Sequence, residues 1–380
     1  MYFLNGDHIY IKPRRRYASI SEELSDCVEQ LEHINEGKKI FRLNFFARIN
    51  TAGDYQQLKG YISQVVSGTF SWPVVFSLIA QAPFTGNIIV EAFYYDAALW
   101  QYSVIEDEAG EAVIFRRGDV EVLAGSVQSC SANRCRENAG KAFSAFGRLL
   151  NNASFPVDAI VRQWNYIENI LGEEEDGQRY QVFNNMRSRF YAGHFSSNGF
   201  PSATGIGMDH GGVIVEFIAV KSGFHKTLSL NNPLQTAAHR YSEKVLHEAH
   251  YSGRSTPKFE RARYLELFDR KLIFISGTAS IRGERTVAEG DPAEQTEVTI
   301  QNIEKLYCDE ALEQIGDVSL TPVYGHARIY IKNRNDFRKI RRIFRSYYGN
   351  LPAVYLVADI CREKLLVEIE GQVVLKEKLS

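Results

Sequence analysis

The segment "LLVEIEG" (residues 365–371) places carboxylates at strand spacing near the end of the chain. Glu368 and Glu370 share one face of the predicted strand by two-residue alternation. The other face is apolar and consists of Leu365, Val367 and Ile369. We expect the apolar face to cover helices and the carboxylates to look away from them. A carboxyl group enclosed by a second layer has a reason to stay protonated near neutral pH and to donate that proton, whereas a solvated one is ordinary.

The segment just before it, "VYLVADIC" (354–361), reads as a second strand that pairs with the first in a hairpin. Asp359 and Cys361 have the parity of its mixed face, which we expect to continue the face of Glu368. The apolar face, which we expect to cover the helices, consists of Val354, Leu356, Ala358 and Ile360. Alternation alone does not choose between Glu368 and Glu370 as the functional carboxyl group.

The predicted secondary-structure elements that would position these residues occur in the same order twice along the chain. Strands, a helix, a strand, a second helix and two strands follow one another in this order before and after residue 225. The copies end alike, with "VEF" at 215–217 and "VEI" at 367–369. We therefore predict an α+β fold of two units, 1–225 with an extra N-terminal segment and 226–380, joined by a connection at about 222–257. Packed together as a pseudo-oligomer, such layers would enclose Glu368 in a cleft.

Bulk composition excludes several classes of function. The 380 residues carry a net charge of -2, so no overall field attracts nucleic acid or an anionic membrane. The five cysteines are scattered, and the N-terminal segment is basic instead of apolar, so we expect a cytoplasmic protein without membrane partners. His247 and His250 are three residues apart instead of four, which argues against a zinc motif, and we expect no metal and no cofactor.

Several short motifs resemble known families. The stretches "ISGTAS", "GHARIYIKN" and "LLVEIEG" resemble the RidA (YjgF) fold. Together with "VRQWNYI", "YQVFNNMR", "PSATGIG", "TPKFERA" and "DICREKLLVEIEG", in this order over most of residues 40–380, they look like the chorismatases. That resemblance implies cleavage of the enolpyruvyl ether of chorismate, which releases pyruvate. It also selects Glu368 as the general acid and leaves Glu370 as a structural or rim residue.

The same resemblance supplies candidate residues for binding the substrate. Arg261 and Arg187 stand at family-like positions and have the geometry to hold the carboxylates of chorismate, although a surface ion pair is the commoner role of arginine. The remaining candidates are Tyr180 and Tyr241 as hydroxyl donors, Gly277 and Ala279 as small residues that let the ring approach, and Cys361 as a residue beside the ring.

Other functions stay open at this stage. A RidA-like imine or enamine deaminase would need an arginine where this chain has Ala353, and a nucleic-acid-binding protein would need more than the basic clusters 14–16 and 338–345. Within the chorismatases, Cys361 favours subtypes that make 3-hydroxybenzoate, whereas Ala279 favours the subtype that makes a dihydroxycyclohexadiene carboxylate. We expect 3-hydroxybenzoate. With two units in one chain, we also expect a monomer.

Overall fold

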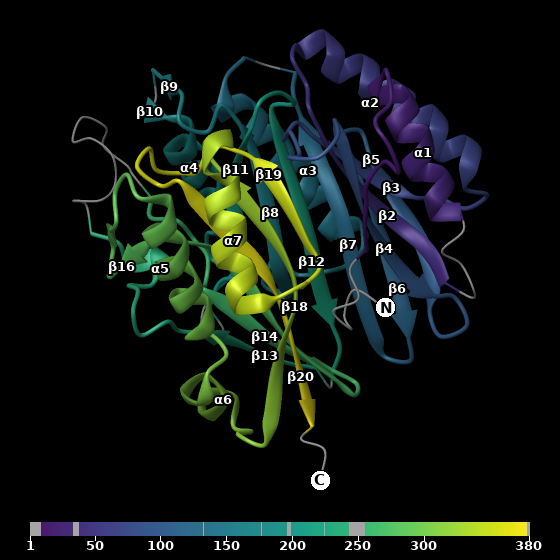
Figure 1. Cartoon of the computed structure of the whole chain (residues 1–380). Coiled ribbons are helices and arrows are strands. Elements are labelled where there is room, and N and C mark those ends of the chain that lie inside the picture. Colours follow the sequence, from purple (N-terminus) through teal and green to yellow (C-terminus); the bar gives the residue numbers. More distant parts are fainter. Residues whose placement is uncertain are drawn as a thin grey trace.

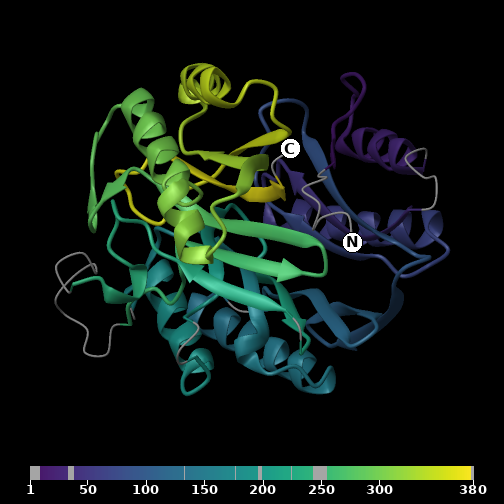
Figure 2. The ribbon, with the colours of Figure 1, turned by 90° about the horizontal axis from the view of Figure 1, so that it is seen from below.

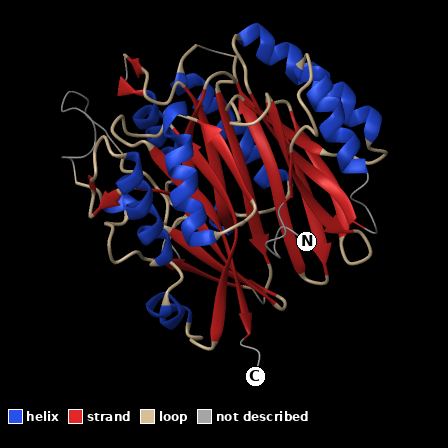
Figure 3. Cartoon of the chain, in the orientation of Figure 1, coloured by secondary structure: helices blue, strands red, loops and turns tan. Residues whose placement is uncertain are grey.

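The computed structural model describes residues 9–32, 38–131, 133–175, 177–195, 199–223, 225–242 and 255–377. The rejected metal motif at His247–His250 and part of the predicted connection lie outside these ranges. Within them, three larger sheets carry the fold, with helices packed against each (Figures 1 and 3). We call them the N-terminal, middle and C-terminal layers. The predicted α+β class, with mixed sheets and helices on one face of each, is confirmed.

The N-terminal layer has the strand order β1-β4-β2-β3. Its helix α2 begins with a capping box, in which Thr51 accepts from the Asp54 backbone N–H and Asp54 accepts from that of Thr51. Tyr55, Leu58 and Ile62 form the buried face of this helix at helical spacing. The elements of the layer are β1 (Ile9–Ile11), α1 (Ile20–Glu32), β2 (Lys38–Ala47), α2 (Ala52–Thr69), β3 (Val75–Ile79) and β4 (Ile88–Asp96).

The middle layer has the strand order β11-β8-β12-β7-β6-β5. Strand β11 is parallel to β8, and the remaining pairs are antiparallel. Its elements are β5 (Gln101–Asp107), β6 (Gly110–Arg117), β7 (Val120–Ser129), α3 (Cys135–Asn152), β8 (Ile160–Glu168), the short β9 (Glu173–Glu174) and β10 (Gly177–Gln178), α4 (Arg179–Tyr191), β11 (Ser202–Met208) and β12 (Val213–Lys221).

The C-terminal layer repeats this topology with the strand order β13-β14-β15-β20-β18-β19. Asp291 caps the helix that follows the first strands, and Pro292 occupies its first position. The elements are β13 (Lys226–Leu230), β14 (Ala262–Leu267), β15 (Arg270–Ala279), the short β16 (Ile281–Arg282) and β17 (Arg285–Thr286), α5 (Pro292–Glu304), α6 (Asp309–Ile315), β18 (Leu320–Ile331), α7 (Phe337–Tyr348), β19 (Ala353–Val357) and β20 (Val367–Glu377).

The N-terminal layer is a shortened third copy of the same topology, which the sequence did not lead us to expect. The orders β1-β4-β2-β3, β7-β12-β8-β11 and β15-β20-β18-β19 correspond strand by strand, and from residue 9 onwards the N-terminal layer has no counterpart of the first two strands of the others. Glu91, Glu216 and Glu368 occupy equivalent places on β4, β12 and β20. The division into domains 1–225 and 226–380 stays a prediction.

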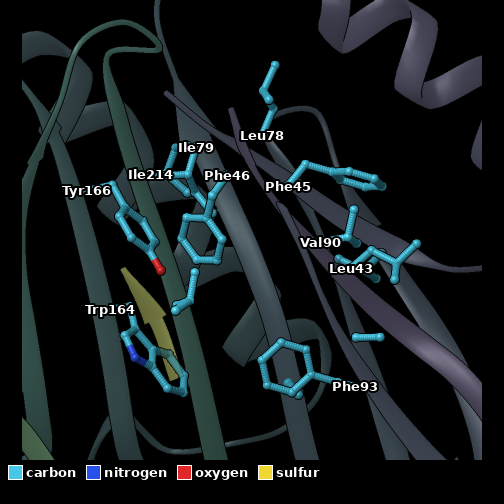
Figure 4. Packing of buried hydrophobic residues seen from close by; sticks show 14 of the residues in the cluster. Leu43, Phe45, Phe46, Leu78, Ile79, Val90, Phe93, Trp164, Tyr166 and Ile214 are labelled. Carbon is cyan, nitrogen blue, oxygen red and sulfur yellow. The ribbon is translucent and has the colours of Figure 1, made fainter. Parts of the chain in front are cut away.

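The layers meet through the faces of their sheets that carry no helices. In Figure 2 the helices lie around the outside and the strands in the middle. One buried cluster joins residues of all three layers, and Figure 4 shows part of it, with Phe46 of β2 beside Tyr166 of β8 and Ile214 of β12. Val367 and Ile369 of β20 face the helices instead, so the prediction that Glu368 and Glu370 look away from the helices is confirmed.

The predicted hairpin at 354–371 is wrong in two respects. Strands β19 and β20 do not pair, because β18 lies between them. The faces of β19 are also inverted: Tyr355 packs against Phe337 and Phe344 of α7, while Val354, Leu356, Ala358 and Ile360 join the core between the layers. The alternation was misleading because both faces of this sheet are buried. The strand ends at Val357, and Asp359 is exposed in the following loop.

Candidate active site

A cleft of about 800 Å³ lies between the middle and C-terminal layers, and we call it the active cleft. Helix α4 and strand β11 form one wall, and β15, β20 and the loop after β19 form the other. It contains every site residue predicted from the sequence: Glu368, Arg261, Arg187, Tyr180, Tyr241, Gly277, Ala279 and Cys361. Their individual roles stay predictions, but the structure brings them together from six separate parts of the chain.

Glu368 is the carboxyl group at the floor of the cleft. It is 4% exposed and makes no ion pair or hydrogen bond with the described residues. Burial raises its pKa to about 8, the charge of Glu370 adds to this effect, and Arg261 and Arg162 oppose it. Glu368 is therefore protonated near neutral pH. A β-carbon at position 277 would lie 2.1 Å from its Oε1 atom, so glycine at this position makes room for the carboxyl group.

Arg261 and Arg187 bring positive charge into the cleft without a carboxylate partner among the described residues. Arg261 donates from Nη2 to the backbone oxygen of Thr236 (2.9 Å) and to the Tyr241 hydroxyl. Arg187 donates from Nη2 to Oδ1 of Asn184 (2.6 Å). The Nε atom of each arginine is buried and has no hydrogen-bond partner within the ranges that the structure describes. Such donors leave capacity for an anionic ligand, since guanidinium matches carboxylate geometry.

The smaller candidates complete the lining. Tyr180 packs over Gly205 of β11, where a β-carbon would lie 3.0 Å from its ring, so this glycine lets helix and strand approach closely. Burial raises the pKa of the Cys361 thiol to about 12, which keeps it neutral and unsuited to act as a nucleophile. Ala279 stands opposite Glu368 on the neighbouring strand β15.

Further lining residues were missed from the sequence. Asn184 lies on α4 between Tyr180 and Arg187, at spacings of four and three residues, so these side chains share one face of the helix. That spacing was readable in "YQVFNNMR" and could have identified Asn184. Phe259 and Arg362 also line the cleft, but they belong to irregular segments for which no periodicity predicts a direction.

The described residues contain no group of three or more His, Cys, Asp or Glu side chains that could hold a metal ion. No helix in the described part of the chain is long and apolar enough to cross a membrane. What the cleft does offer is a neutral carboxyl group that can donate a proton, next to arginines that can hold carboxylates. This combination suits acid catalysis on a small, negatively charged substrate.

Comparisons with known proteins agree with this chemistry. A family model described as chorismatase FkbO/Hyg5-like, N-terminal, matches residues 99–219. A chorismatase of Streptomyces hygroscopicus is 30% identical over 275 residues, which cover 71% of this chain and 76% of the relative. A 3-hydroxybenzoate synthase of the same organism is 32% identical over 231 residues, or 58% of this chain and 64% of the relative. A crystal structure of a chorismatase matches with a TM-score of 0.71 at 23% identity, covering 97% of this chain and 98% of that one.

Proposed function

The chain belongs to the chorismatase family, and from that premise we propose that it cleaves the enolpyruvyl ether of chorismate with Glu368 as the proton donor. The observation that carries this proposal is the state of Glu368. Its carboxyl group is buried, unpaired among the described residues and protonated near pH 7, in the same cleft as Arg187 and Arg261. A proton donor of this kind is what an enol ether requires.

The reaction begins with proton transfer to carbon. Glu368 protonates the terminal methylene carbon of the enolpyruvyl group, and the double bond supplies the electron pair of the new C–H bond. The resulting oxocarbenium ion is attacked by water or by a hydroxyl of the substrate, and breakdown of the adduct releases pyruvate. Proton donation of this kind contributes about 10²–10⁴-fold to the rate.

Arg187 and Arg261 hold the two carboxylates of chorismate in this proposal. Each arginine retains a buried Nε–H donor, and each guanidinium lies near the ring of Phe259, at 5.9 Å for Arg187 and 5.4 Å for Arg261. These contacts fix the planes of the guanidinium groups before the ligand arrives, which reduces the ordering required on binding.

We propose 3-hydroxybenzoate as the second product. The similarity to a 3-hydroxybenzoate synthase and the presence of Cys361 in the cleft support this choice. Formation of pyruvate and a hydroxybenzoate from chorismate consumes no net water, because elimination from the ring returns the water used in cleavage. Hydrolysis to a dihydroxycyclohexadiene carboxylate consumes one water molecule.

Chromatography of the products after incubation with chorismate tests this proposal. We expect pyruvate and 3-hydroxybenzoate in equal amounts without added metal or nucleotide. Equal amounts of pyruvate and the dihydroxycyclohexadiene carboxylate would retain the cleavage and overturn the choice of product. If folded enzyme at micromolar concentration releases no pyruvate but releases ammonia from an imine substrate, the protein is a deaminase instead.

A further inference from the structure

The three layers place a glutamate and an arginine at matching positions in their sheets. Glu91 stands opposite Asn44, Glu216 opposite Trp164, and Glu368 opposite Tyr330. Two residues before Asn44, Trp164 and Tyr330, on the same face of each strand, are arginines: Arg42, Arg162 and Arg328. The three glutamates are therefore equivalent by register, and so are the three arginines.

The arginines join the layers in a cycle of buried ion pairs, which we call the arginine–glutamate ring. Arg42 of the N-terminal layer pairs with Glu216 of the middle layer. Arg328 of the C-terminal layer pairs with Glu91 of the N-terminal layer, with 2.5 Å between Nη2 and Oε2. By the same rule Arg162 of the middle layer would pair with Glu368.

Arg162 pairs with Glu370 instead. Glu370 stands opposite Arg328, and the equivalent residues of the other layers are Phe93 and Ile218, which are apolar. The C-terminal layer thus carries an additional carboxylate two residues beyond the equivalent position. This substitution shifts the ion pair along β20 and releases Glu368 from the ring.

Glu370 is held by donors on each of its oxygens. Oε1 accepts from the Tyr330 hydroxyl (2.7 Å) and from Nη1 of Arg328 (3.1 Å), and Oε2 accepts from Nη2 of Arg162 and from the Thr204 hydroxyl. Because every contact is a donor to the carboxyl group, the group is an ionised carboxylate.

Thr204 links this carboxylate to the floor of the active cleft. Its Oγ1 accepts from Nη2 of Arg162 (2.8 Å) and from the backbone N–H of Gly277 (3.0 Å), the residue that lies against Glu368. Through Thr204, Glu370 is therefore connected by hydrogen bonds to Gly277, which lies against the proton donor Glu368.

We propose that Glu370 is a positioning residue for the general acid: by occupying Arg162 and Arg328 it keeps their guanidinium groups from pairing with Glu368, which stays unpaired and protonated. The inference rests on the proposed role of Glu368 in chorismate cleavage. Glu370 also acts by its own charge, since a second negative charge two residues away on the same strand face disfavours ionisation of Glu368.

Other groups near Glu368 must be considered in any pH argument. They come from α4, β8, the segment before β14, β18 and the loop after β19, and comprise Tyr180, Arg187, Arg162, Arg261, Tyr241, Tyr330, Cys361 and Arg362. Tyr180, Tyr330 and Cys361 are neutral near pH 7, because burial raises their pKa values. The cations Arg187, Arg261 and Arg362 are present with or without Glu370, so its replacement changes the balance through Arg162, through Arg328 and through the loss of its own negative charge.

Glu370→Gln tests the proposal, because it keeps the shape and removes the charge. We expect Arg162 to turn to Glu368, which then ionises at lower pH. The alkaline midpoint of the kcat profile should fall by about one pH unit or more, as an opposite charge nearby lowers a carboxyl pKa. The Glu368 carboxyl band in an isotope-edited infrared spectrum is assigned by its absence in Glu368→Gln. The midpoint of the pH titration of this band should fall by the same amount. An unchanged midpoint in folded Glu370→Gln overturns the proposal.

The double variant Glu370→Gln with Arg162→Met identifies the cause. Without the released cation, the midpoint should return part of the way towards the wild-type value, and a double variant that remains at the single variant's midpoint contradicts the proposed competition. Glu91→Gln is the matched control, since it breaks the same ring away from Glu368. It should lower stability and leave the midpoint in place, and an equal fall in this control would show a general effect of the ring and overturn the proposal.

A folding defect in Glu370→Gln does not end the test. Arg162→Met alone leaves Glu370 held by Arg328 and Tyr330, and the midpoint should then stay or rise, so a fall contradicts the proposal. The infrared titration needs no substrate. A shifted titration in Glu370→Gln, with no pyruvate release from the wild type, would therefore retain the positioning role and reject the proposed function. Pyruvate release from the wild type, with no shift of the titration in Glu370→Gln, would retain the proposed function and reject the positioning role.

Discussion

Two of the clefts in the described part of the chain lie at equivalent places, and they differ in what the side chains of their walls can do. The active cleft lies between α4 and β11 on one side and β15 and β20 on the other. A second cleft, of about 720 Å³, lies between α2 and β3 on one side and the β5–β6 turn, β7 and β12 on the other. The helices correspond along their length, since "YQQLKGYISQVVSG" at 55–68 aligns with "YQVFNNMRSRFYAG" at 180–193.

The second cleft lacks the features that we assign to catalysis. Glu216, the equivalent of Glu368, is paired with Arg42. Ser77 and Ser126, the equivalents of Thr204 and Ala279, are joined by a hydrogen bond of 2.9 Å between their hydroxyls. Lys59, the equivalent of Asn184, donates from Nζ to Oε1 of Gln128 (2.5 Å). The same arrangement of elements thus forms a cleft twice, and in our proposal the acid role of the carboxyl group depends on whether an arginine pairs with it.

The largest expected effect is a loss of turnover when Glu368 is replaced, which replacement of the equivalent Glu216 should not reproduce. Glu368→Gln should lower kcat about 10²–10⁴-fold, because the amide has no transferable proton. Glu216→Gln removes the same atom from the equivalent place and should act on stability, since breaking a buried ion pair costs about 3–5 kcal/mol. Pyruvate release and thermal unfolding measure the two effects. Near-full turnover in Glu368→Gln would refute its role.

A smaller effect, on the KM for chorismate, should distinguish Arg261 in the active cleft from Lys59 in the second cleft. Arg261→Ala should raise the KM for chorismate about tenfold or more, because a substrate carboxylate loses its charged partner, and each 1.4 kcal/mol is a factor of ten. Lys59→Ala, in the second cleft, should leave KM unchanged. Steady-state kinetics at varied chorismate checks the pair, and equal values for the two variants would move the anion site elsewhere.

The smallest effect concerns stability and pH. The pKa of Glu368 is raised from 4.5 to about 8 in the folded protein. The protonated group therefore contributes stability that is fully present below about pH 4.5 and is lost as the pH rises to about 8. Relative to Glu368→Gln, the free energy of unfolding of the wild type should fall by about 1 kcal/mol or more between these two pH values. Denaturant unfolding at a series of pH values checks this, and parallel curves for the two proteins would contradict the raised pKa.

Much of the active cleft was predictable from the sequence. Strand alternation gave the direction of Glu368, and the repeated order of elements gave a second layer to cover it. The ordered motifs then supplied Arg187, Arg261 and the smaller lining residues. These inferences were possible because they depend either on a few neighbouring residues or on an order of elements that both the middle and the C-terminal layers show in full.

The third layer was missed because its copy is incomplete. Without the first two strands, the N-terminal segment does not show the order that identified the other copies. The traces were nevertheless present: "VEA" at 90–92 matches "VEF" and "VEI", and the helix at 55–68 keeps the Tyr, Gln, Ser and Gly positions of its counterpart.

The role proposed for Glu370 was beyond reach for a different reason. Alternation placed it on the same face as Glu368, and the family resemblance left it as a structural or rim residue. The structure shows it fully buried and bound to Arg162 and Arg328, which come from strands far away in the sequence. No periodicity encodes which of two neighbouring carboxylates meets a distant arginine, because this depends on how the layers pack.

The presence of all three layers in one chain has a consequence for how the arginine–glutamate ring could become unequal. In a symmetric assembly of identical subunits, any substitution appears in every copy, so an added glutamate like Glu370 would change every interface together. Here Phe93, Ile218 and Glu370 are encoded separately, and one interface carries the change while the others keep the closed pairing. Covalent linkage thus allows one interface to specialise in the catalysis that we propose, while ion pairs at the other two hold the layers together.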